Sequence, residues 1–337
     1  MLRVAIIGCG YWGAHLIRNF NNSDLWQVSY LCDIDIAHLQ NISKQYPGIP
    51  TTTHYQDILN DSTIDAVVIA SSSATHFQIA KDALLSGKNI WVEKPFTQDS
   101  KEAQELISLA KELNLIINVD HTYLYTSAIE KIKEIIDSGE LGSIIYIDTI
   151  RINLGLFRHD ENVLWDLAPH DISIINYIHP IQAISVSATG NSYYPYSNKK
   201  LEEVAYITIK FADKSVAHIN VNWLSPIKIR QMIIGGTKKM LVFDDMLNTE
   251  KIKVYNSGVT LQNREDIYDV LVQYRTGDMY SPALKSNEAL ATECKHFYDR
   301  IVSKVKTNTD GEAGLLNVKI LEAAQQSLDS GGKEILL

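Results

Sequence analysis

The sequence has few cysteines, few basic residues and no long hydrophobic run, and each shortage excludes a class of protein. Its apolar runs, such as VAII and AVVIA, fall far short of the roughly 18 residues that cross a bilayer, so we expect no membrane partner. The N-terminus runs directly into a strand-like pattern, which indicates no secretory signal peptide. Cys9, Cys32 and Cys294 form no CxxC or Cys/His zinc pattern, so we expect no metal site and a reducing, cytoplasmic location.

Positive charge is scarce as well, because 31 lysines and arginines face 40 aspartates and glutamates and leave a net charge of −9. A dedicated nucleic-acid binder would show a basic surface, so we expect no nucleic-acid partner. A small anionic ligand remains compatible with this balance, since a local pair of arginines can bind it. With 337 residues, 45% of them hydrophobic, the chain is long enough for about two globular domains.

The first part of the chain alternates short apolar runs with amphipathic stretches. The apolar runs lie at 2–7, 28–33, 66–70, 89–93 and 115–119, and the amphipathic stretches lie near 12–22, 36–46, 75–86 and 99–113. Near-continuous apolar runs are typical of strands covered on both faces, and their alternation with helices predicts βαβ units and a parallel sheet. The sequence therefore predicts an α/β fold whose first domain spans residues 1–122.

The pattern changes after residue 122. Helices are expected near 127–138, from about 169 to 178, and near 284–304 and 313–327, with a strand at 144–153. Between 182 and 256 apolar and polar residues alternate, most clearly at 205–211 and 217–223, which predicts an antiparallel hairpin with one buried face. We therefore expect a second domain over residues 123–337 that combines helices with antiparallel strands.

A G-x-G-x-x-G pattern, GCGYWG, starts at Gly8 between the first predicted strand and the first predicted helix. In this context Gly8 permits a tight turn, Gly10 lets the backbone approach a pyrophosphate, and Gly13 allows close packing of helix on strand. The helix N-terminus would supply N–H donors to the phosphates, with Tyr11 and Trp12 in the same loop. The alternative, a tight turn without a ligand, fits this context poorly.

Asp33 ends the second predicted strand, 20 residues after Gly13. A carboxylate there accepts hydrogen bonds from a ribose diol and repels the 2′-phosphate of NADP. Asp35 adds to that repulsion, and no arginine at 34–37 offsets it. We therefore expect NAD rather than NADP as the cofactor.

Two further segments follow predicted strands, at the edge of the sheet where ligands bind. Ser71 and Ser72 would let a dinucleotide lie close, and His76 would touch it, although the segment could simply cap a helix with His76 on the surface. Glu93 and Lys94 follow the next strand, and both would contact the cofactor. From spacing alone, a reactive lysine and a surface ion pair are equally good interpretations.

These segments together resemble the Gfo/Idh/MocA family of oxidoreductases over the whole chain. The resemblance rests on GCGYWG at 8–13, the strand-end Asp33, ASSSATH at 70–76, EKP at 93–95 and DLAPH at 166–170, which matches the family's D-x-x-x-H. It implies a Rossmann domain, followed by a substrate-binding and oligomerisation domain with a large open, mostly antiparallel sheet. It also implies hydride exchange at a sugar or cyclitol carbon, with Lys94, Asp166 and His170 as catalytic, substrate-contacting groups. The chain departs from the family at residues 71–73, where many members carry proline, and at Asp120, where a small residue is commoner.

Four segments look like one branch of that family, namely GYWGAHLIRNF at 10–20, HTYLYT at 121–126, RINLGLFR at 151–158 and VLWDLAPHDISI at 163–174. Members of that branch oxidise the C3 hydroxyl of UDP-N-acetylglucosamine, or of its uronic acid, to a ketone. A pyridoxal-phosphate aminotransferase then installs a 3-amino group in diamino-sugar biosynthesis for lipopolysaccharide or capsule. The resemblance therefore implies a UDP-sugar substrate and a functional link to such an aminotransferase.

Oxidation of a secondary alcohol needs a base for the hydroxyl proton and an acceptor for the hydride. His170 titrates near neutral pH and suits the base, and Asp166, four residues earlier, would share its helix face and orient the imidazole. Lys94 could hydrogen-bond the reacting oxygen, or could itself accept the proton if burial lowers its pKa. Without the resemblance, a helix cap for Asp166 and a buried structural role for His170 are the stronger interpretations.

Substrate contacts are expected around these groups. Arg151 and Asn153 lie on one face of a predicted strand, and Arg158 follows it. Guanidinium groups suit bidentate contact with a diphosphate, so we expect Arg151 or Arg158 to bind it, although a solvated arginine is an equally good interpretation. His121 and Tyr123 open the second predicted domain, and we expect them near the sugar.

Three other functions stay open: a 3-keto reductase of a dTDP-sugar, a dehydrogenase of inositol or a free sugar, and a non-catalytic sensor of NAD and a sugar. The reductase would often use NADPH, the free-sugar enzyme would not need the two arginines, and the sensor would not need Lys94 or His170. Tyr206 and Trp223 on later strands are expected in the core or at an interface. A sheet face with exposed apolar residues would pair with another subunit, which predicts a homodimer or homotetramer.

Overall fold

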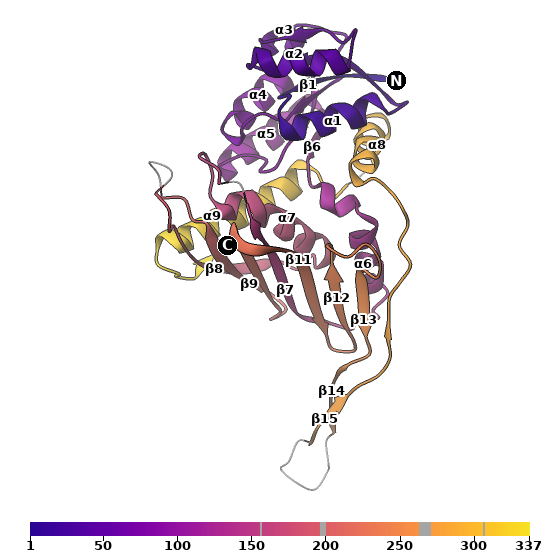
Figure 1. Cartoon of the computed structure of the whole chain (residues 1–337), viewed down its shortest axis with the longest axis vertical. Coiled ribbons are helices and arrows are strands. Elements are labelled where there is room, and N and C mark those ends of the chain that lie inside the picture. The colour runs from indigo at the N-terminus through magenta and orange to yellow at the C-terminus, as the bar shows by residue number, and fades with distance from the viewer. Residues whose placement is uncertain (156, 196–199, 263–270, 306) are drawn as a thin grey trace. The chain divides into compact units, whose positions relative to one another are not determined.

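The computed structural model describes the chain except residues 156, 196–199, 263–270 and 306 (Figure 1). The chain divides into two compact units, each made of two stretches of chain. The first comprises Met1–Tyr125 and Asn287–Lys319, and the second comprises Thr126–Ser286 and Ile320–Leu337. The first division falls close to residue 122, where a domain was expected to end. The sequence pattern did not foresee that residues 287–319 return to the first unit.

Parallel strands form the sheet of the first unit, in the order β3-β2-β1-β4-β5-β6. Its strands are β1 (Leu2–Ile7), β2 (Trp26–Cys32), β3 (Thr51–Thr52), β4 (Ala66–Ile69), β5 (Asn89–Val92) and β6 (Ile117–Val119). β4 is buried along its whole length and β1 along most of it, as their continuous apolar sequences predicted. The order of strands reverses between β1 and β4, and such sheets bind ligands at the carboxyl ends of those strands. The prediction of an α/β fold with a Rossmann-like first part is confirmed.

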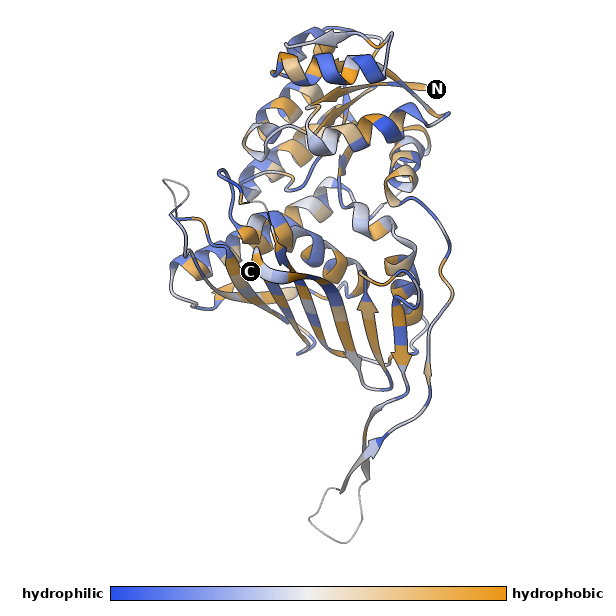
Figure 2. Cartoon of the chain, in the orientation of Figure 1, coloured by the Kyte–Doolittle hydropathy of each residue, from blue (hydrophilic) through white to orange (hydrophobic). Residues whose placement is uncertain are grey.

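Helices connect these strands, and in Figure 2 they show hydrophobic and hydrophilic residues together. They are α1 (Tyr11–Asn21), α2 (Ile36–Gln45), α3 (Tyr55–Leu59), α4 (Ser73–Leu85) and α5 (Ser100–Leu113), followed by the 3₁₀ turn η1 (Thr122–Tyr125). α8 (Ala289–Ser303) and the first part of α9 (Gly311–Asp329) return to this unit. Phe297 of α8 stacks on Trp26 with ring centroids 5.3 Å apart, and Trp91 meets Phe297 edge-on. This buried aromatic cluster explains why so distant a segment completes the unit.

A nine-stranded mixed sheet forms the described part of the second unit, in the order β16-β13-β12-β11-β7-β10-β9-β8-β17. Its strands are β7 (Ile144–Leu154), β8 (Ala183–Asn191), β9 (Val204–Phe211), β10 (Val216–Asn222), β11 (Leu224–Gly236), β12 (Met240–Asp244), β13 (Ile252–Tyr255), β16 (Met279–Tyr280) and β17 (Ile335–Leu336). β10 pairs with β7 in parallel, and the other described pairs are antiparallel, which confirms a mostly antiparallel sheet. β14 (Gly258–Gln262) and β15 (Leu271–Arg275) form a separate hairpin beyond this sheet (Figure 1).

This unit also contains α6 (Ser127–Asp137), α7 (Val163–Ile178) and the second part of α9. Helix α7 packs on β7, β9 and β10. α7 begins earlier than the predicted start near residue 169, because Asn162 caps it by accepting the backbone N–H of Trp165. Pro169 therefore lies inside the helix, and the expectation that it occupies the first turn is wrong. Asp166 lies in that first turn instead.

No described helix is long and apolar enough to cross a membrane. No group of three or more His, Cys, Asp or Glu side chains in the described ranges could hold a metal ion.

Candidate cofactor and active site

The glycine loop turns sharply between β1 and α1. Gly8 has a φ of +96°, and a Cβ atom there would lie 2.4 Å from the carbonyl oxygen of Ala70. A Cβ atom on Gly13 would lie 2.0 Å from the carbonyl oxygen of Gly8, so only glycine allows this packing of α1 on β1. At Gly10, by contrast, a Cβ atom would meet no protein atom within 4 Å. The protein itself does not demand glycine there, which fits a backbone that leaves room for a pyrophosphate.

Asp33 connects this loop to the end of β2 through a hydrogen bond. Its Oδ2 accepts the backbone N–H of Cys9 at 2.7 Å, and its Oδ1 accepts that of Asp35 at 2.9 Å. Nδ1 of His38 lies 3.8 Å from a carboxylate oxygen of each of these aspartates. Two carboxylates thus lie at the position expected for the cofactor ribose, and their negative charge disfavours a 2′-phosphate.

A cavity of about 620 Å³ opens at the carboxyl ends of β1, β2 and β4. This volume is typical of cofactor and small-molecule sites. Five residues predicted to bind the cofactor line the cavity, namely Gly8, Gly10, Asp33, Ser71 and Ser72. The apolar side chain of Ile34 and the aromatic side chain of Tyr55 also line the cavity. The residues present therefore fit the adenosine and pyrophosphate part of NAD.

His76 is buried and bridges the loops after β4 and β5, so its placement on the surface, one of the two interpretations, is wrong. Its Nδ1 lies 2.9 Å from the carbonyl oxygen of Pro95, and its Nε2 lies 3.2 Å from that of Ser71. Burial lowers the pKa of His76, while the two carbonyl oxygens, which favour the protonated ring, act in the opposite direction. His76 thereby holds Ser71 beside the segment that contains Lys94.

Glu93 belongs to a buried cluster of three carboxyl groups with Asp120 and Glu293. The side chains of Glu93 and Glu293 both lie close enough to Asp120 to interact with its carboxyl group. Burial, followed by the charge of Asp120, raises the pKa of both glutamates well above the ordinary value. Burial beside a like charge therefore favours the protonated form of both glutamates, compared with a glutamate in water. The surface ion-pair interpretation of Glu93 is wrong.

Trp12 joins this carboxyl cluster to the glycine loop. Its Nε1 donates to Oδ2 of Asp120 at 3.1 Å, and the backbone N–H of Thr122 donates to Oδ1 at 3.0 Å. Neighbouring Tyr11 is largely exposed. The sequence marked Asp120 as a departure from the family pattern, but its partner lies 108 residues away and no local signal pointed to it.

Lys94, His121 and Tyr123 all lie in the first unit. Lys94 follows the carboxyl end of β5 and is partly buried. His121 is buried next to Asp120, and burial lowers its pKa to about 4, so its ring is neutral at physiological pH. Tyr123 belongs to η1. The expectation that His121 and Tyr123 open the second domain is therefore corrected, because the chain enters the second unit only at Thr126.

In the second unit, Asp166 and His170 lie one turn apart on α7, as the spacing predicted. Nε1 of Trp223 donates to Oδ2 of Asp166 at 3.2 Å, and Nε of Arg158 lies 3.3 Å from Oδ1. Since Asn162 caps the helix, the interpretation of Asp166 as the cap is wrong. Both oxygens of the Asp166 carboxylate are thus held in place from outside the helix.

Trp223 was expected in the core or at an interface, and it is buried. It packs over Gly155, where a Cβ atom would lie 2.8 Å from the indole ring. Glycine at 155 therefore leaves the space that the indole needs to reach Asp166. Its contact with Asp166 is the functional signal that the sequence pattern did not reveal.

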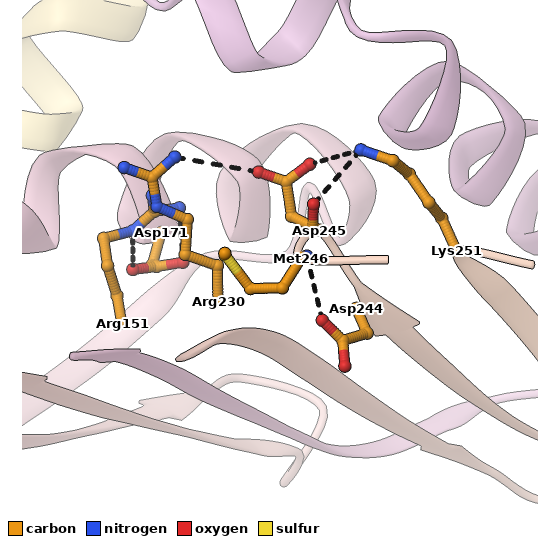
Figure 3. Close-up of polar contacts among 7 residues, drawn as sticks. All are labelled: Arg151, Asp171, Arg230, Asp244, Asp245, Met246 and Lys251. Carbon is orange, nitrogen blue, oxygen red and sulfur yellow. Dashed lines mark hydrogen bonds and ion pairs between the residues drawn. The ribbon is translucent and has the colours of Figure 1, made fainter. Parts of the chain in front are cut away.

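Arg151 and Arg158 both form ion pairs. Nε and Nη2 of Arg151 contact the two carboxylate oxygens of Asp171 at 2.7 and 3.1 Å, with both side chains almost fully buried (Figure 3). The interpretation of Arg151 as a solvated arginine is therefore wrong. Arg158 also lies 3.2 Å from Oε1 of Glu161, in addition to its contact with Asp166. Asn153 is partly buried, two residues beyond Arg151 on β7.

The parallel sheet, the glycine loop, the carboxylate of Asp33 and the adjoining cavity define the first unit as a Rossmann dinucleotide-binding domain. Residues 2–121 match the family model described as an oxidoreductase family with an NAD-binding Rossmann fold, and residues 129–242 match the C-terminal domain model of the same family. The chain belongs to the Gfo/Idh/MocA family of oxidoreductases, and the prediction of NAD as cofactor is confirmed.

Three known proteins show how far the similarity extends. The chain is 26% identical to a UDP-N-acetylglucosamine 3-dehydrogenase of Acidithiobacillus ferrooxidans, over 96% of each chain. It is 25% identical to an NAD-dependent scyllo-inositol 2-dehydrogenase of Bacillus subtilis, over 98% of this chain and 95% of the relative. The crystal structure of GenD2 from gentamicin A biosynthesis, in complex with NAD, superposes with a TM-score of 0.84 at 19% identity, covering 100% of this chain and 96% of that one. The last comparison supports the fold.

Proposed function

We propose that the protein oxidises the C3 hydroxyl of a UDP-linked N-acetyl amino sugar, UDP-N-acetylglucosamine or its uronic acid, to the 3-keto sugar with NAD. The observation that carries the proposal is the similarity to a UDP-N-acetylglucosamine 3-dehydrogenase over nearly the whole of both chains. The pair of Asp166 and His170 on one face of α7, with a fixed carboxylate, supplies the chemistry that this reaction needs.

The oxidation removes a hydride from C3 and a proton from its hydroxyl group. NAD, when bound, supplies the hydride acceptor. The imidazole of His170 takes the hydroxyl proton, and the carboxylate of Asp166 stabilises the imidazolium that results. The ammonium group of Lys94 donates a hydrogen bond to the reacting oxygen and stabilises its alkoxide character. His121, Tyr123 and Asn153 contact the sugar in this proposal.

The proposed reaction implies partners. A 3-keto sugar is the substrate of a pyridoxal-phosphate aminotransferase, which would pull the oxidation forward and produce a 3-amino sugar. We also propose a homodimer or homotetramer, supported by Tyr206, a large aromatic side chain that is exposed on strand β9 between buried neighbours. Light scattering of the purified protein tests the oligomer, and a monomer would contradict it.

The experiment that tests the proposed function is substrate-dependent formation of NADH. UDP-N-acetylglucosamine, its uronic acid, dTDP-glucose and myo-inositol are each incubated with NAD, and separately with NADP, in the presence of a 3-aminotransferase and glutamate. We expect turnover with a UDP-N-acetyl sugar and NAD. Tight NAD binding without turnover of any sugar would contradict an enzyme and favour a sensor. Turnover of the dTDP-sugar alone would favour the corresponding nucleotide-sugar enzyme.

Oxidation of a cyclitol is the second candidate, because the similarity to the scyllo-inositol 2-dehydrogenase also extends over nearly the whole of both chains. The catalytic groups would act in the same way on either substrate. Turnover of myo-inositol but of no nucleotide sugar in the same assay would establish this alternative.

A further inference from the structure

Two exposed tyrosines follow strand β8 in the second unit. Tyr193 and Tyr194 belong to residues 192–195, which we call the tyrosine loop, and their exposed fractions are 60% and 54%. A tyrosine combines a large apolar face with a polar end, which makes it common in binding surfaces. Exposure alone does not mark a site, because single exposed apolar side chains are ordinary on protein surfaces.

A buried carboxylate holds the backbone of the tyrosine loop. Glu203 has an exposed fraction of 0%, and its Oε2 accepts the backbone N–H of Tyr193 at 2.7 Å while its Oε1 accepts that of Tyr194 at 3.2 Å. A buried carboxylate is costly unless its oxygens accept hydrogen bonds, and here both oxygens bind consecutive residues of one loop. Connecting loops are ordinarily mobile. A buried charge that fixes such a loop therefore indicates that the position of its tyrosines matters.

The ring of Tyr194 is also restrained. It packs against Phe157, with the ring centroids 5.9 Å apart and the ring planes inclined by 38°. Phe157 in turn packs against Trp223, at 6.0 Å and 30°. Aromatic rings at these separations attract one another. Tyr194, Phe157 and Trp223 thus form a row of three rings, which we call the aromatic row, and Tyr194 is its exposed end.

The aromatic row leads to the proposed catalytic carboxylate. Trp223, at the buried end of the row, donates from Nε1 to Oδ2 of Asp166 at 3.2 Å. The residues of the row and Asp166 all belong to the second unit. Tyr194 and Asp166 are therefore the two ends of one connected set of side chains, with two rings between them.

Backbone hydrogen bonds connect the tyrosine loop to the same elements. The backbone N–H of Trp223 donates to the carbonyl oxygen of Glu203 at 2.9 Å. The backbone N–H of Val163, the first residue of α7, donates to the carbonyl oxygen of Glu202, also at 2.9 Å. These two glutamates therefore link the loop both to Trp223 and to the start of the helix that contains the proposed catalytic pair.

The exposed end of the aromatic row fits one part of a nucleotide sugar. Such a molecule carries its base and its sugar at opposite ends of the diphosphate. When C3 of the sugar lies at the pair of Asp166 and His170, the base must lie away from that pair. A base has two flat faces, and either face can stack on an exposed aromatic ring. Tyr194 meets both requirements, because its ring is exposed and two rings separate it from Asp166.

We propose that Tyr194 stacks on the base of the nucleotide-sugar substrate, and that Glu203 is the positioning residue that holds the loop of Tyr194 in place. The proposal rests on the proposed function in that it takes the substrate to be a nucleotide sugar. Stacking recognises the face of the base rather than its hydrogen-bonding edge, so the site should bind UDP and dTDP alike.

The test replaces Tyr194 by leucine, which keeps an apolar side chain and removes the aromatic face. Tyr274→Leu is the matched control, because Tyr274 on β15 is an exposed tyrosine of the same unit, with an exposed fraction of 84%. Calorimetry in saturating NADH gives the Kd of UDP, and steady-state kinetics give kcat and KM for UDP-N-acetylglucosamine. Loss of a base stack lowers affinity at least about fivefold, so we expect Tyr194→Leu to raise both Kd and KM by at least that factor. The Kd of NAD should not change, and Tyr274→Leu should behave like the wild type.

Three results would overturn the base site. The first is an unchanged Kd of UDP in Tyr194→Leu, even if KM rises, because a rise in KM alone would mean that the ring contacts the sugar. The second is a wild-type protein that does not bind UDP. The third is a Kd for Tyr194→Phe, which keeps the ring, as weak as that for Tyr194→Leu. Thermal unfolding checks folding, and Tyr194→Met is measured instead if the leucine variant does not fold.

Glu203→Gln tests the positioning role. Glutamine offers one acceptor oxygen instead of two, so one of the two backbone N–H groups of the tyrosine loop loses its partner. We expect KM for UDP-N-acetylglucosamine to rise and kcat to stay near the wild-type value, the pattern of weakened substrate binding. A fall in kcat with an unchanged KM, or no change in either, would overturn this role.

The proposed function can fail separately from the base site. If the wild type oxidises neither UDP-N-acetylglucosamine nor its uronic acid, the Kd of UDP still tests Tyr194, because that measurement needs no turnover. A weaker Kd for Tyr194→Leu would then support a nucleotide site although the proposed oxidation fails. Equal values for both proteins, including no binding to either, would overturn the base site as well.

Discussion

The indole N–H of Trp223 donates a 3.2 Å hydrogen bond to the carboxylate of Asp166, across 57 residues of sequence. This contact joins the end of the β9–β10 hairpin to the first turn of α7. Because Arg158 holds the other oxygen, the carboxylate cannot rotate freely. Asp166 is therefore held in one orientation in the first turn of α7, one turn before His170.

Removal of this donor should impair catalysis without affecting the cofactor. Hydrogen bonds to charged groups contribute about 1.5–3 kcal/mol, so we expect Trp223→Phe to lower kcat roughly 10- to 100-fold. The Kd of NAD, measured by fluorescence titration, should not change. Trp91→Phe is the control, because Trp91 is also buried but its indole N–H has no hydrogen-bond partner. Equal effects of the two substitutions on kcat would show that Trp223 contributes packing alone.

Lys94 and His170 should each be required for turnover. Loss of a positioned acid or base typically lowers the rate 10²- to 10⁴-fold, and we expect a decrease in about that range for Lys94→Met and for His170→Asn. Single-turnover formation of NADH measures the chemical step directly. A variant that retains the wild-type rate would exclude that residue from the reaction and leave the other as the proton acceptor.

Asp33 should determine the choice between NAD and NADP. Asp33→Ser removes both the acceptor for the backbone N–H of Cys9 and the charge that repels a 2′-phosphate. We expect the KM of NAD to rise at least about tenfold, and the ratio of kcat/KM for NADP over NAD to increase. Addition of Ile34→Arg, at an exposed position that lines the cavity, should increase that ratio further. A ratio that stays constant in both variants would contradict this role.

The carboxyl cluster should make the protein less stable as the pH rises. The unfolded chain releases the proton of Glu293 near pH 4.3, whereas the folded protein retains it to higher pH because its pKa is raised by burial and by Asp120. The folded state thus binds more protons above that pH, so the free energy of unfolding falls as the pH increases. Glu293→Gln cannot ionise and can still accept the hydrogen bond from Asn118. We expect its melting temperature to fall less than that of the wild type between pH 5 and pH 8.

Glu112→Gln, at an exposed position on α5, is the control for this measurement. Its melting temperature should follow that of the wild type at every pH. If Glu293→Gln also follows the wild type, the cluster does not retain the proton in the folded state.

Much of the first unit could be predicted because its signals are local. The glycine loop, Asp33 and the continuous apolar strands each lie within a few residues of sequence. The remaining features depend on contacts between distant residues, as in Trp12 with Asp120 and Arg151 with Arg230. The sequence pattern placed the start of α7 at Pro169, because proline is common in the first turn of a helix. The helix begins earlier because Asn162 caps it, and Pro169 lies inside it. Strand register and helix-cap geometry depend on contacts that form only in the folded chain. They could therefore not be predicted from the pattern of apolar residues.

The return of residues 287–319 makes the cofactor unit discontinuous, so most of the second unit, from Thr126 to Ser286, is an insertion within it. A fragment that stops at Tyr125 would expose Trp26 and Trp91, which Phe297 covers in the full chain. Constructing a minimal NAD-binding fragment therefore requires a linker that replaces residues 126–286 rather than a simple truncation. By the same reasoning, a chimera that exchanges the second unit between family members needs two fusion points, one on each side of that unit. A chimera with a single fusion point would take Trp26 and Trp91 from one parent and the segment that contains Phe297 from the other.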